Sequence, residues 1–313
     1  MKYTQIALLL AISALAIPAW ADEQGGQLLS LIAKQSPSIC TVKAMLKTEM
    51  KFGGQAQDSE SKITVAGVIV DPDGIVMISN IPLSPSRAME MLGGGAGAEG
   101  MNMKATASGF KVIFEREEKE YDAFLAATDT KLDLAFVKVE GLSDRKLPAV
   151  DFSAASDLVI GQQVAAVARL QKGYDYAPYV QTARVTGEIA KPRKAWMLEG
   201  GISELGLPVY SMTGQVVGVL STISAAGKEE GDDSASFSMF MRMMGGGGMK
   251  MGGTFVVPGA PIKGVIELAK QRAVTLAAER AAKKKDAVAA TAAPKKPVAT
   301  APASPPAVKP KKP

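Results

Sequence analysis

The sequence predicts an all-β fold, and three observations carry this prediction. Short runs rich in Val, Ile, Leu and Phe recur along the chain, separated by Gly, Pro, Asp and Asn. Two pairs of runs flank tight turns, at residues 71–74 and 212–214, as in β-hairpins. The composition is 47% hydrophobic but only 5% aromatic, which favours an aliphatic core. Regularly spaced short strands before one terminal helix indicate a barrel or sandwich rather than alternating strands and helices.

The first 21 residues have the pattern of a signal peptide. Lys2 supplies the charge, "IALLLAISALAI" is the apolar run, and Ala19-Trp20-Ala21 is a small-x-small cleavage site. We therefore expect cleavage after Ala21 and a periplasmic or secreted protein. Residues 22–36 follow as a short amphipathic helix, which the sequence Ser-Pro-Ser ends.

The region 37–271 is expected to hold the β-domain. Asp71-Pro72-Asp73-Gly74 is the turn of its first clear hairpin, because Pro and Gly stand where turn geometry favours them. Met212-Thr213-Gly214 is the turn of a second hairpin. Residues 52–61 read as a loop, and so do two Gly/Met-rich segments, 86–109 and 239–253. The remaining runs predict strands at 39–50, 65–70, 75–79, 110–115, 120–127, 132–139, 161–170, 180–189, 206–222 (as a hairpin) and 254–258.

The C-terminal part of the chain is helical and then low in complexity. A helix is expected from residue 260, with residues 272–285 extending it beyond the β-domain. Residues 286–313 are mostly Ala, Pro, Lys and Thr, with little to bury, so a disordered tail is expected. From residue 272 onward there are 10 basic and 2 acidic residues, whereas the whole chain has a net charge of +5. The tail is therefore cationic, and we expect either non-specific contact with anionic cell-wall, lipid or nucleic-acid polymers or a solubilising spacer.

Histidine is absent from all 313 residues. This excludes a Ser-His-Asp or Cys-His nucleophile, a histidine base and histidine metal ligands. The single cysteine, Cys40, cannot form an intramolecular disulfide, and its apolar neighbours Ile39 and Val42 predict burial. We expect no cofactor.

Five stretches, in order, resemble the trypsin-like serine proteases of the HtrA (DegP) type. They are "SPSICTVKA", "GVIVDPDGIVMISN", "KVIFEREEKEYDAFLAATDTKLDLAFVKVE", "GLPVYSMTGQVVGVLS" and "TFVVPGAPIKGVIELAKQ". The resemblance implies a double barrel of two packed six-stranded antiparallel β-barrels, with the active site in the cleft between them. The family usually continues into a PDZ domain and often forms trimers. Here we expect no PDZ domain, and a homo-oligomer stays open.

The resemblance also assigns the positions of the catalytic triad. It puts Ile81 at the histidine position, Asp133 at the aspartate position and Leu205 at the serine position. Isoleucine cannot take a proton and leucine offers no nucleophile, so only the aspartate is retained. We therefore expect an inactive homologue that binds a polypeptide or protein partner, or serves as a scaffold, through the degenerate cleft.

Two alternatives remain open from the sequence. A divergent serine endopeptidase would use Ser203 as a displaced nucleophile, with Lys191 or Lys194 as an unusual base. A periplasmic Cu(I)-binding protein would use soft thioether ligands from its methionine-rich loops, which otherwise read as adaptable apolar surfaces. The candidate ligands in the second loop are Met239, Met241, Met243, Met244, Met249 and Met251, and the first loop holds Met89, Met91, Met101 and Met103.

Overall fold

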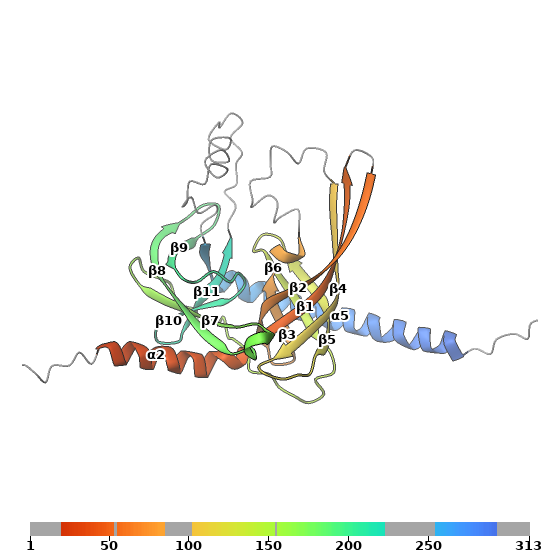
Figure 1. Cartoon of the computed structure of the whole chain (residues 1–313), viewed down its shortest axis with the longest axis horizontal. Helices are drawn as coiled ribbons and strands as arrows, with labels where there is room; N and C mark the ends of the chain where they lie inside the picture. Colours follow the sequence, from red (N-terminus) through yellow and green to blue (C-terminus); the bar gives the residue numbers. More distant parts are fainter. Residues whose placement is uncertain (1–19, 53–54, 85–101, 154, 223–253, 293–313) are drawn as a thin grey trace, which may run out of the picture. The chain divides into compact units, whose positions relative to one another are not determined.

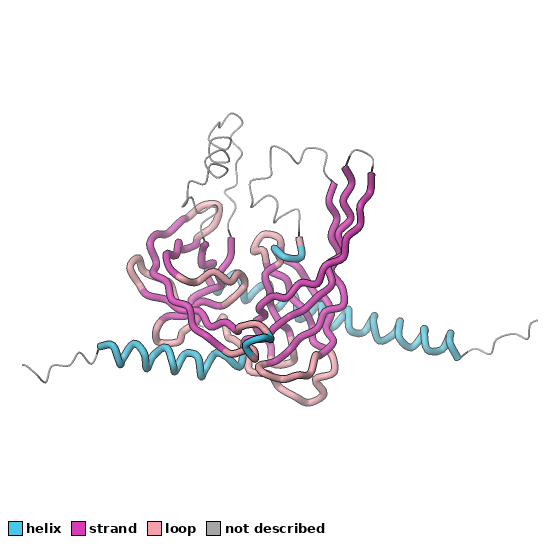
Figure 2. Tube along the Cα trace, in the orientation of Figure 1, coloured by secondary structure: helices cyan, strands magenta, loops and turns pink. Residues whose placement is uncertain are grey.

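The computed structural model describes residues 20–52, 55–84, 102–153, 155–222 and 254–292. In these ranges the strands form two closed β-barrels, each of six antiparallel strands (Figures 1 and 2). The predicted fold class is confirmed. The signal-peptide prediction lies largely outside the described residues, and the predicted cleavage point after Ala21 falls at the beginning of the first described helix.

The first barrel contains β1 to β6 and positions the first clear hairpin. Around the barrel the strands follow the order β1 (Ile39–Phe52), β2 (Gln55–Asp71), β3 (Ile75–Ser79), β6 (Leu134–Val139), β5 (Tyr121–Asp129) and β4 (Asn102–Phe114). All five residues of β3 are buried, because this strand lies between β2 and β6. The interior is filled by aliphatic and aromatic side chains that include Val76, Ile78, Phe114 and Val137. Cys40 is buried in this core, as predicted.

Three strands of this barrel are longer than predicted and continue past it as a ribbon (Figure 2). The expected loop at 52–61 was wrong, since β1 runs to Phe52 and β2 begins at Gln55. The predicted loop 86–109 also ends earlier, because residues 102–109 form the first half of β4. The central strand β1 pairs with both neighbours, as at Thr48, which lies opposite Ser59 and Ala105. Backbone pairing on both sides thus holds a polar sequence in strands despite its weak hydrophobic pattern.

The second barrel holds the second hairpin. Its order is β10 (Pro208–Ser211), β11 (Val216–Thr222), β12 (Thr254–Pro258), β9 (Ala195–Gly200), β8 (Pro178–Ile189) and β7 (Gln163–Arg169). The predicted hairpin at 206–222 is confirmed, with its turn at Gly214 in the left-handed region at φ +83°. Sequence analysis missed β9, whose run "AWMLEG" is short and contains no β-branched residue. The loop 239–253 lies outside the described residues.

An N-terminal helix and one arginine fix the entry of the chain into the first barrel. Helix α2 (Trp20–Gln35) and the short 3₁₀ helix η1 (Ser36–Ser38) precede β1. Arg169, at the end of β7, donates hydrogen bonds to the carbonyl oxygens of Ser36, Ile39 and Tyr176 over 2.7, 2.8 and 3.0 Å. The guanidinium therefore ties the N-terminal segment to the second barrel.

The chain divides into two compact units, residues 1–273 and 274–313. The closing helix, α5 (Gly259–Ala292), begins in the first unit and ends in the second. In the first unit it buries one face through Ile262, Ile266 and Ala269, the spacing expected of an amphipathic helix. The helix continues to Ala292, so the predicted start of a tail at residue 286 was too early. None of the helices described here is both long enough and apolar enough to cross a membrane.

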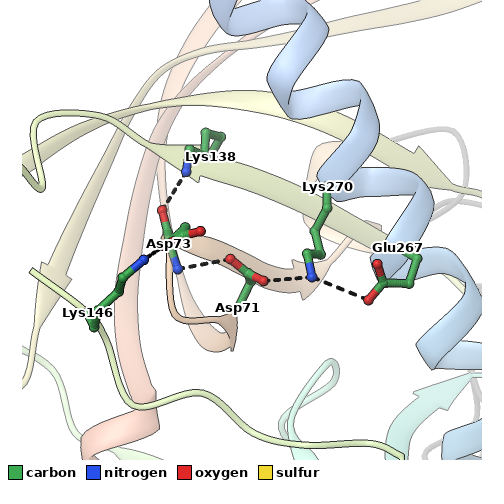
Figure 3. A network of polar contacts seen from close by, with 6 residues as sticks. All are labelled: Asp71, Asp73, Lys138, Lys146, Glu267 and Lys270. Atoms are coloured by element: carbon green, nitrogen blue, oxygen red, sulfur yellow. Dashed lines mark hydrogen bonds and ion pairs between the residues drawn. The ribbon is translucent and has the colours of Figure 1, made fainter. Parts of the chain in front are cut away.

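The turn of the β2–β3 hairpin is held by charged groups, as Figure 3 shows. The buried Asp71 carboxylate accepts a hydrogen bond from the backbone N–H of Asp73 over 2.9 Å and pairs with Lys270 of α5 at 2.9 Å. Lys146 pairs with the Asp73 carboxylate, and Lys138 donates to its carbonyl oxygen. Gly74 closes the turn at φ +93°, where a glycine is favoured. The hairpin is thereby anchored to α5 at its turn end.

Candidate functional site

The hairpin delivers Ile81 at the end opposite its turn. Directly after β3, Asn80 donates its backbone N–H to the Asp133 carbonyl oxygen over 2.8 Å. A 3₁₀ helix, η2 (Ile81–Leu83), then begins, with Pro82 in its first turn, and the Ile81 N–H donates to Ser79 Oγ over 3.3 Å. These bonds fix the backbone on both sides of Ile81. Its side chain is partly buried and lines a cavity.

Asp133 lies next to this segment and reaches the second barrel through its carboxylate. It precedes β6 with a left-handed backbone at φ +53°, and only 3% of it is exposed. Its Oδ2 accepts a hydrogen bond from Thr222 Oγ1 of β11 over 3.2 Å. The neighbouring Ser221 hydroxyl donates to the Leu132 carbonyl oxygen over 2.9 Å. The aspartate predicted from the resemblance thus joins the two barrels through polar contacts.

The loop before β10 brings Leu205 to the same place. Gly206, which follows Leu205, has φ +85°, and a Cβ built on it would lie 2.6 Å from the Ser79 backbone nitrogen. Close approach of the two segments therefore requires a glycine. The Gly206 N–H donates to the Leu220 carbonyl oxygen over 2.8 Å, and the Leu205 side chain packs partly against the core of the second barrel.

Ile81 and Leu205 line one cavity of about 370 Å³. This volume lies within the range of small-ligand sites. Its walls come from β1, β2 and the segment after β3 in the first barrel, and from the end of β7 and the loop before β10 in the second. The lining residues are Cys40, Thr41, Thr64, Val65, Ala66, Ser79, Ile81, Pro82, Arg169, Leu170, Gln171, Ser203, Glu204 and Leu205.

One acidic group in the cavity wall was not singled out from the sequence. Glu204 Oε1 accepts a hydrogen bond from the Tyr179 hydroxyl of β8. Burial and the adjacent Glu204 carboxylate raise the pKa of Tyr179 to about 12, so the phenol remains a donor at neutral pH. The sequence carries no signal for this contact, because a single glutamate between Ser203 and Leu205 does not indicate that a tyrosine of a distant strand lies beside it.

The groups proposed for a divergent enzyme are not gathered around Ser203. Ser203 lines the cavity and is exposed, whereas neither Lys191 nor Lys194 lines it. Lys194 Nζ lies 3.2 Å from Asp157 Oδ2 and 5.0 Å from the centroid of the Trp196 ring. Cys40 also lines the cavity, but burial raises the pKa of its thiol to about 12, so the thiol stays protonated at neutral pH.

The candidate copper ligands lie outside the described residues, except Met103, whose place in β4 is described for its backbone alone. Among the described residues, no group of three or more Cys, Asp and Glu could hold a metal ion.

Two closed barrels with a cavity between them define a trypsin-like peptidase domain. Residues 65–219 match the family model described as "Trypsin-like peptidase domain". The sequence-based resemblance is thus confirmed for the domain type. Among solved structures the chain is similar to the one described as "Crystal structure of Deg5", with 20% identity, 64% of this chain and 86% of that chain covered, and a TM-score of 0.43. No curated protein matches the sequence.

Proposed function

We propose that this protein is an exported, catalytically inactive HtrA-like homologue that binds polypeptide in the cleft between its barrels. One observation carries the proposal: Ile81 and Leu205, which the sequence resemblance assigns to the positions of the base and the nucleophile, line the same cavity. Neither side chain can exchange a proton or attack a carbonyl. The chain contains no histidine that could replace Ile81.

The chemistry of the cavity supports binding rather than hydrolysis. Ile81 and Leu205 give the cavity apolar surface, which a bound side chain would remove from water. The Asp133 carboxylate accepts a hydrogen bond from the Thr222 hydroxyl, and the chain has no imidazole for it to orient. Export is supported by the residue pattern at 1–21.

The experiment has a hydrolysis arm and a binding arm, both with the full chain. We expect no turnover of fluorescent casein and no labelling of Ser203 by a fluorophosphonate, read by peptide mass spectrometry. We expect saturable binding of fluorescein-labelled, unfolded casein by anisotropy. Leu205→Trp, which fills the cavity, should weaken binding by about tenfold or more.

Leu268→Trp is the matched control, because Leu268 is 64% exposed on α5 and does not line the cavity. Ile81→Trp tests the opposite wall if Leu205→Trp is poorly folded. Turnover that disappears in Ser203→Ala would overturn the proposal. Binding that neither tryptophan weakens in folded protein would overturn it as well.

A further inference from the structure

We propose that the cavity selects a polypeptide segment in which an aliphatic residue stands beside lysine or arginine, and that Glu204 recognises the cation. This inference rests on the proposed function and adds the chemical class of the bound segment. It follows from the apolar walls, from the charged groups in them and from the adjacency of Leu205 and Glu204.

The apolar part of the cavity fits an aliphatic side chain. Val65 and Ala66 of β2, Ile81 and Pro82 of η2, and Leu170 and Leu205 of the second barrel provide this surface. Close to 370 Å³ is room for one or two side chains rather than for a folded element. Burial of apolar surface therefore selects a valine, isoleucine or leucine of an extended segment.

Among the described residues that line the cavity, Arg169 and Glu204 carry charge. Nε, Nη1 and Nη2 of Arg169 each donate to a backbone carbonyl oxygen, so these donors serve the N-terminal segment. Burial lowers the pKa of Arg169, while the nearby Glu115 carboxylate opposes that effect. The arginine is thus engaged by structural acceptors and by an acidic group other than Glu204.

Glu204 has a different environment. Its described hydrogen bond comes from Tyr179, a neutral donor, and within the described ranges no lysine or arginine forms an ion pair with it. The side chain is only partly exposed. A partly desolvated carboxylate attracts a cation more strongly than a fully solvated one. Complementary charge gives specificity at such a site, so the bound segment is expected to supply a cation.

Tyr179 acts as a positioning residue for this recognition. Its hydroxyl holds Oε1 of Glu204 and leaves Oε2 for an incoming ammonium or guanidinium group. Because Glu204 directly precedes Leu205 in the same loop, the cation and the aliphatic side chain must be close neighbours in the bound sequence. Side chains of an extended segment alternate in direction, so a basic residue next to the aliphatic one can face the loop while the latter enters the cavity.

The test compares three short fluorescein-labelled peptides of identical length. Each has a central valine, flanked on both sides by lysine, glutamine or glutamate. At low salt we expect the order Lys, Gln, Glu from tightest to weakest, with about a tenfold difference in Kd between the Lys and Glu peptides. Glu204→Gln should bring the three affinities to within about twofold of one another. Tyr179→Phe should reduce the ratio between the affinities of the Lys and Glu peptides.

Glu199→Gln is the matched control, because Glu199 is an exposed residue of β9 outside the cavity lining and its loss changes the net charge equally. An unchanged peptide order in Glu199→Gln supports the assignment to Glu204. If all three peptides bind equally and Leu205→Trp still abolishes binding, the charge selection is overturned and the proposed function stands. If no peptide binds, both are overturned. Should Glu204→Gln fold poorly, Tyr179→Phe decides through the same ratio.

Discussion

At its turn end, the β2–β3 hairpin is surrounded by charged side chains, whereas at its other end it presents an isoleucine to a largely apolar cavity. Asp71, Asp73, Lys146 and Lys270 form the network at the turn (Figure 3). Ile81, two residues after β3, faces the cavity that Leu205 also lines. One short strand, β3, therefore lies between the charged network at the turn and the aliphatic side chain of Ile81 in the cavity wall.

The two ends of the hairpin differ in what their side chains do for the fold. Polar side chains connect separate elements at two places: Asp71 pairs with Lys270 of α5, and Asp133 accepts a hydrogen bond from Thr222 of β11. Under the proposed function, Ile81 and Leu205 occupy the positions of the base and the nucleophile, where an inactive homologue needs no polar group. The proposal therefore expects a cleft that binds a polypeptide without hydrolysing it.

The largest effect is expected where the cleft end is most closely packed, at Gly206. In Gly206→Ala the added Cβ would lie 2.6 Å from the Ser79 nitrogen, at a residue whose φ is already +85°. The backbone at Ser79 cannot move aside without breaking strand pairing, so we expect a loss of about 3 kcal/mol or more in the free energy of unfolding. Urea unfolding followed by circular dichroism measures it.

Gly141→Ala is the control for Gly206→Ala. Gly141 has a similar φ of +74°, but a Cβ there would meet nothing within 4 Å. Only the backbone penalty applies, so the expected loss is about 1 kcal/mol. Equal losses in the two variants would mean that the contact between Gly206 and Ser79 does not constrain the cleft.

The second prediction restores the missing groups to the apolar end. In Ile81→His/Leu205→Ser, an imidazole would stand beside Asp133 and opposite a serine hydroxyl. We expect fluorophosphonate labelling of residue 205 about a hundredfold faster than in Leu205→Ser alone, because a positioned base contributes roughly this factor or more. Labelling rates are measured by mass spectrometry.

The added Asp133→Ala change serves as the control for the restored pair, since it removes the group that would orient the imidazole. It should slow labelling again. A folded double variant that labels no faster than Leu205→Ser would contradict a triad-like arrangement of positions 81, 133 and 205.

A smaller effect is expected at the polar contact between the barrels. Thr222→Val keeps the shape of the side chain but removes the hydroxyl that donates to Asp133, a residue only 3% exposed. We expect a loss of about 1–2 kcal/mol in the free energy of unfolding. Thr186→Val is the control, because Thr186 is exposed on β8, and it should change stability little. Equal losses would deny Asp133 a structural role.

Sequence reasoning predicted the parts of this molecule that depend on local patterns. The turns at Gly74 and Gly214 and the buried strands around them carry clear turn and hydrophobic signals. The parts of β2 and β4 that form the ribbon with β1 were missed because pairing between distant strands, not local hydrophobicity, stabilises them. The contact between Tyr179 and Glu204 was missed for a related reason, since no spacing in the sequence relates a strand residue to a distant loop.

The smallest effects are expected at the turn end, where Lys270 and Lys146 can be compared because each pairs with one aspartate of the turn. Asp71 and Lys270, which pair at 2.9 Å, have side chains that are 10% and 38% exposed. Lys270→Met leaves the buried Asp71 carboxylate without this partner, and we expect a loss of about 1 kcal/mol in the free energy of unfolding. Lys146 and Asp73 are 71% and 62% exposed, so solvent screens their pair and Lys146→Met should leave the urea midpoint unchanged.

The pH dependence separates these two lysines further. Lys146 lowers the pKa of Asp73, so any stabilisation from that pair is present above the unfolded-state pKa and is lost as the pH falls through the folded one. Asp71 raises the pKa of Lys270, so that contribution is complete below the unfolded-state pKa of lysine and is lost as the pH rises through the folded value. Wild type and Lys270→Met should therefore differ in urea midpoint at neutral pH and converge at strongly alkaline pH. A Lys146→Met midpoint as low as that of Lys270→Met at neutral pH would mean that burial of Asp71 does not strengthen the anchor to α5.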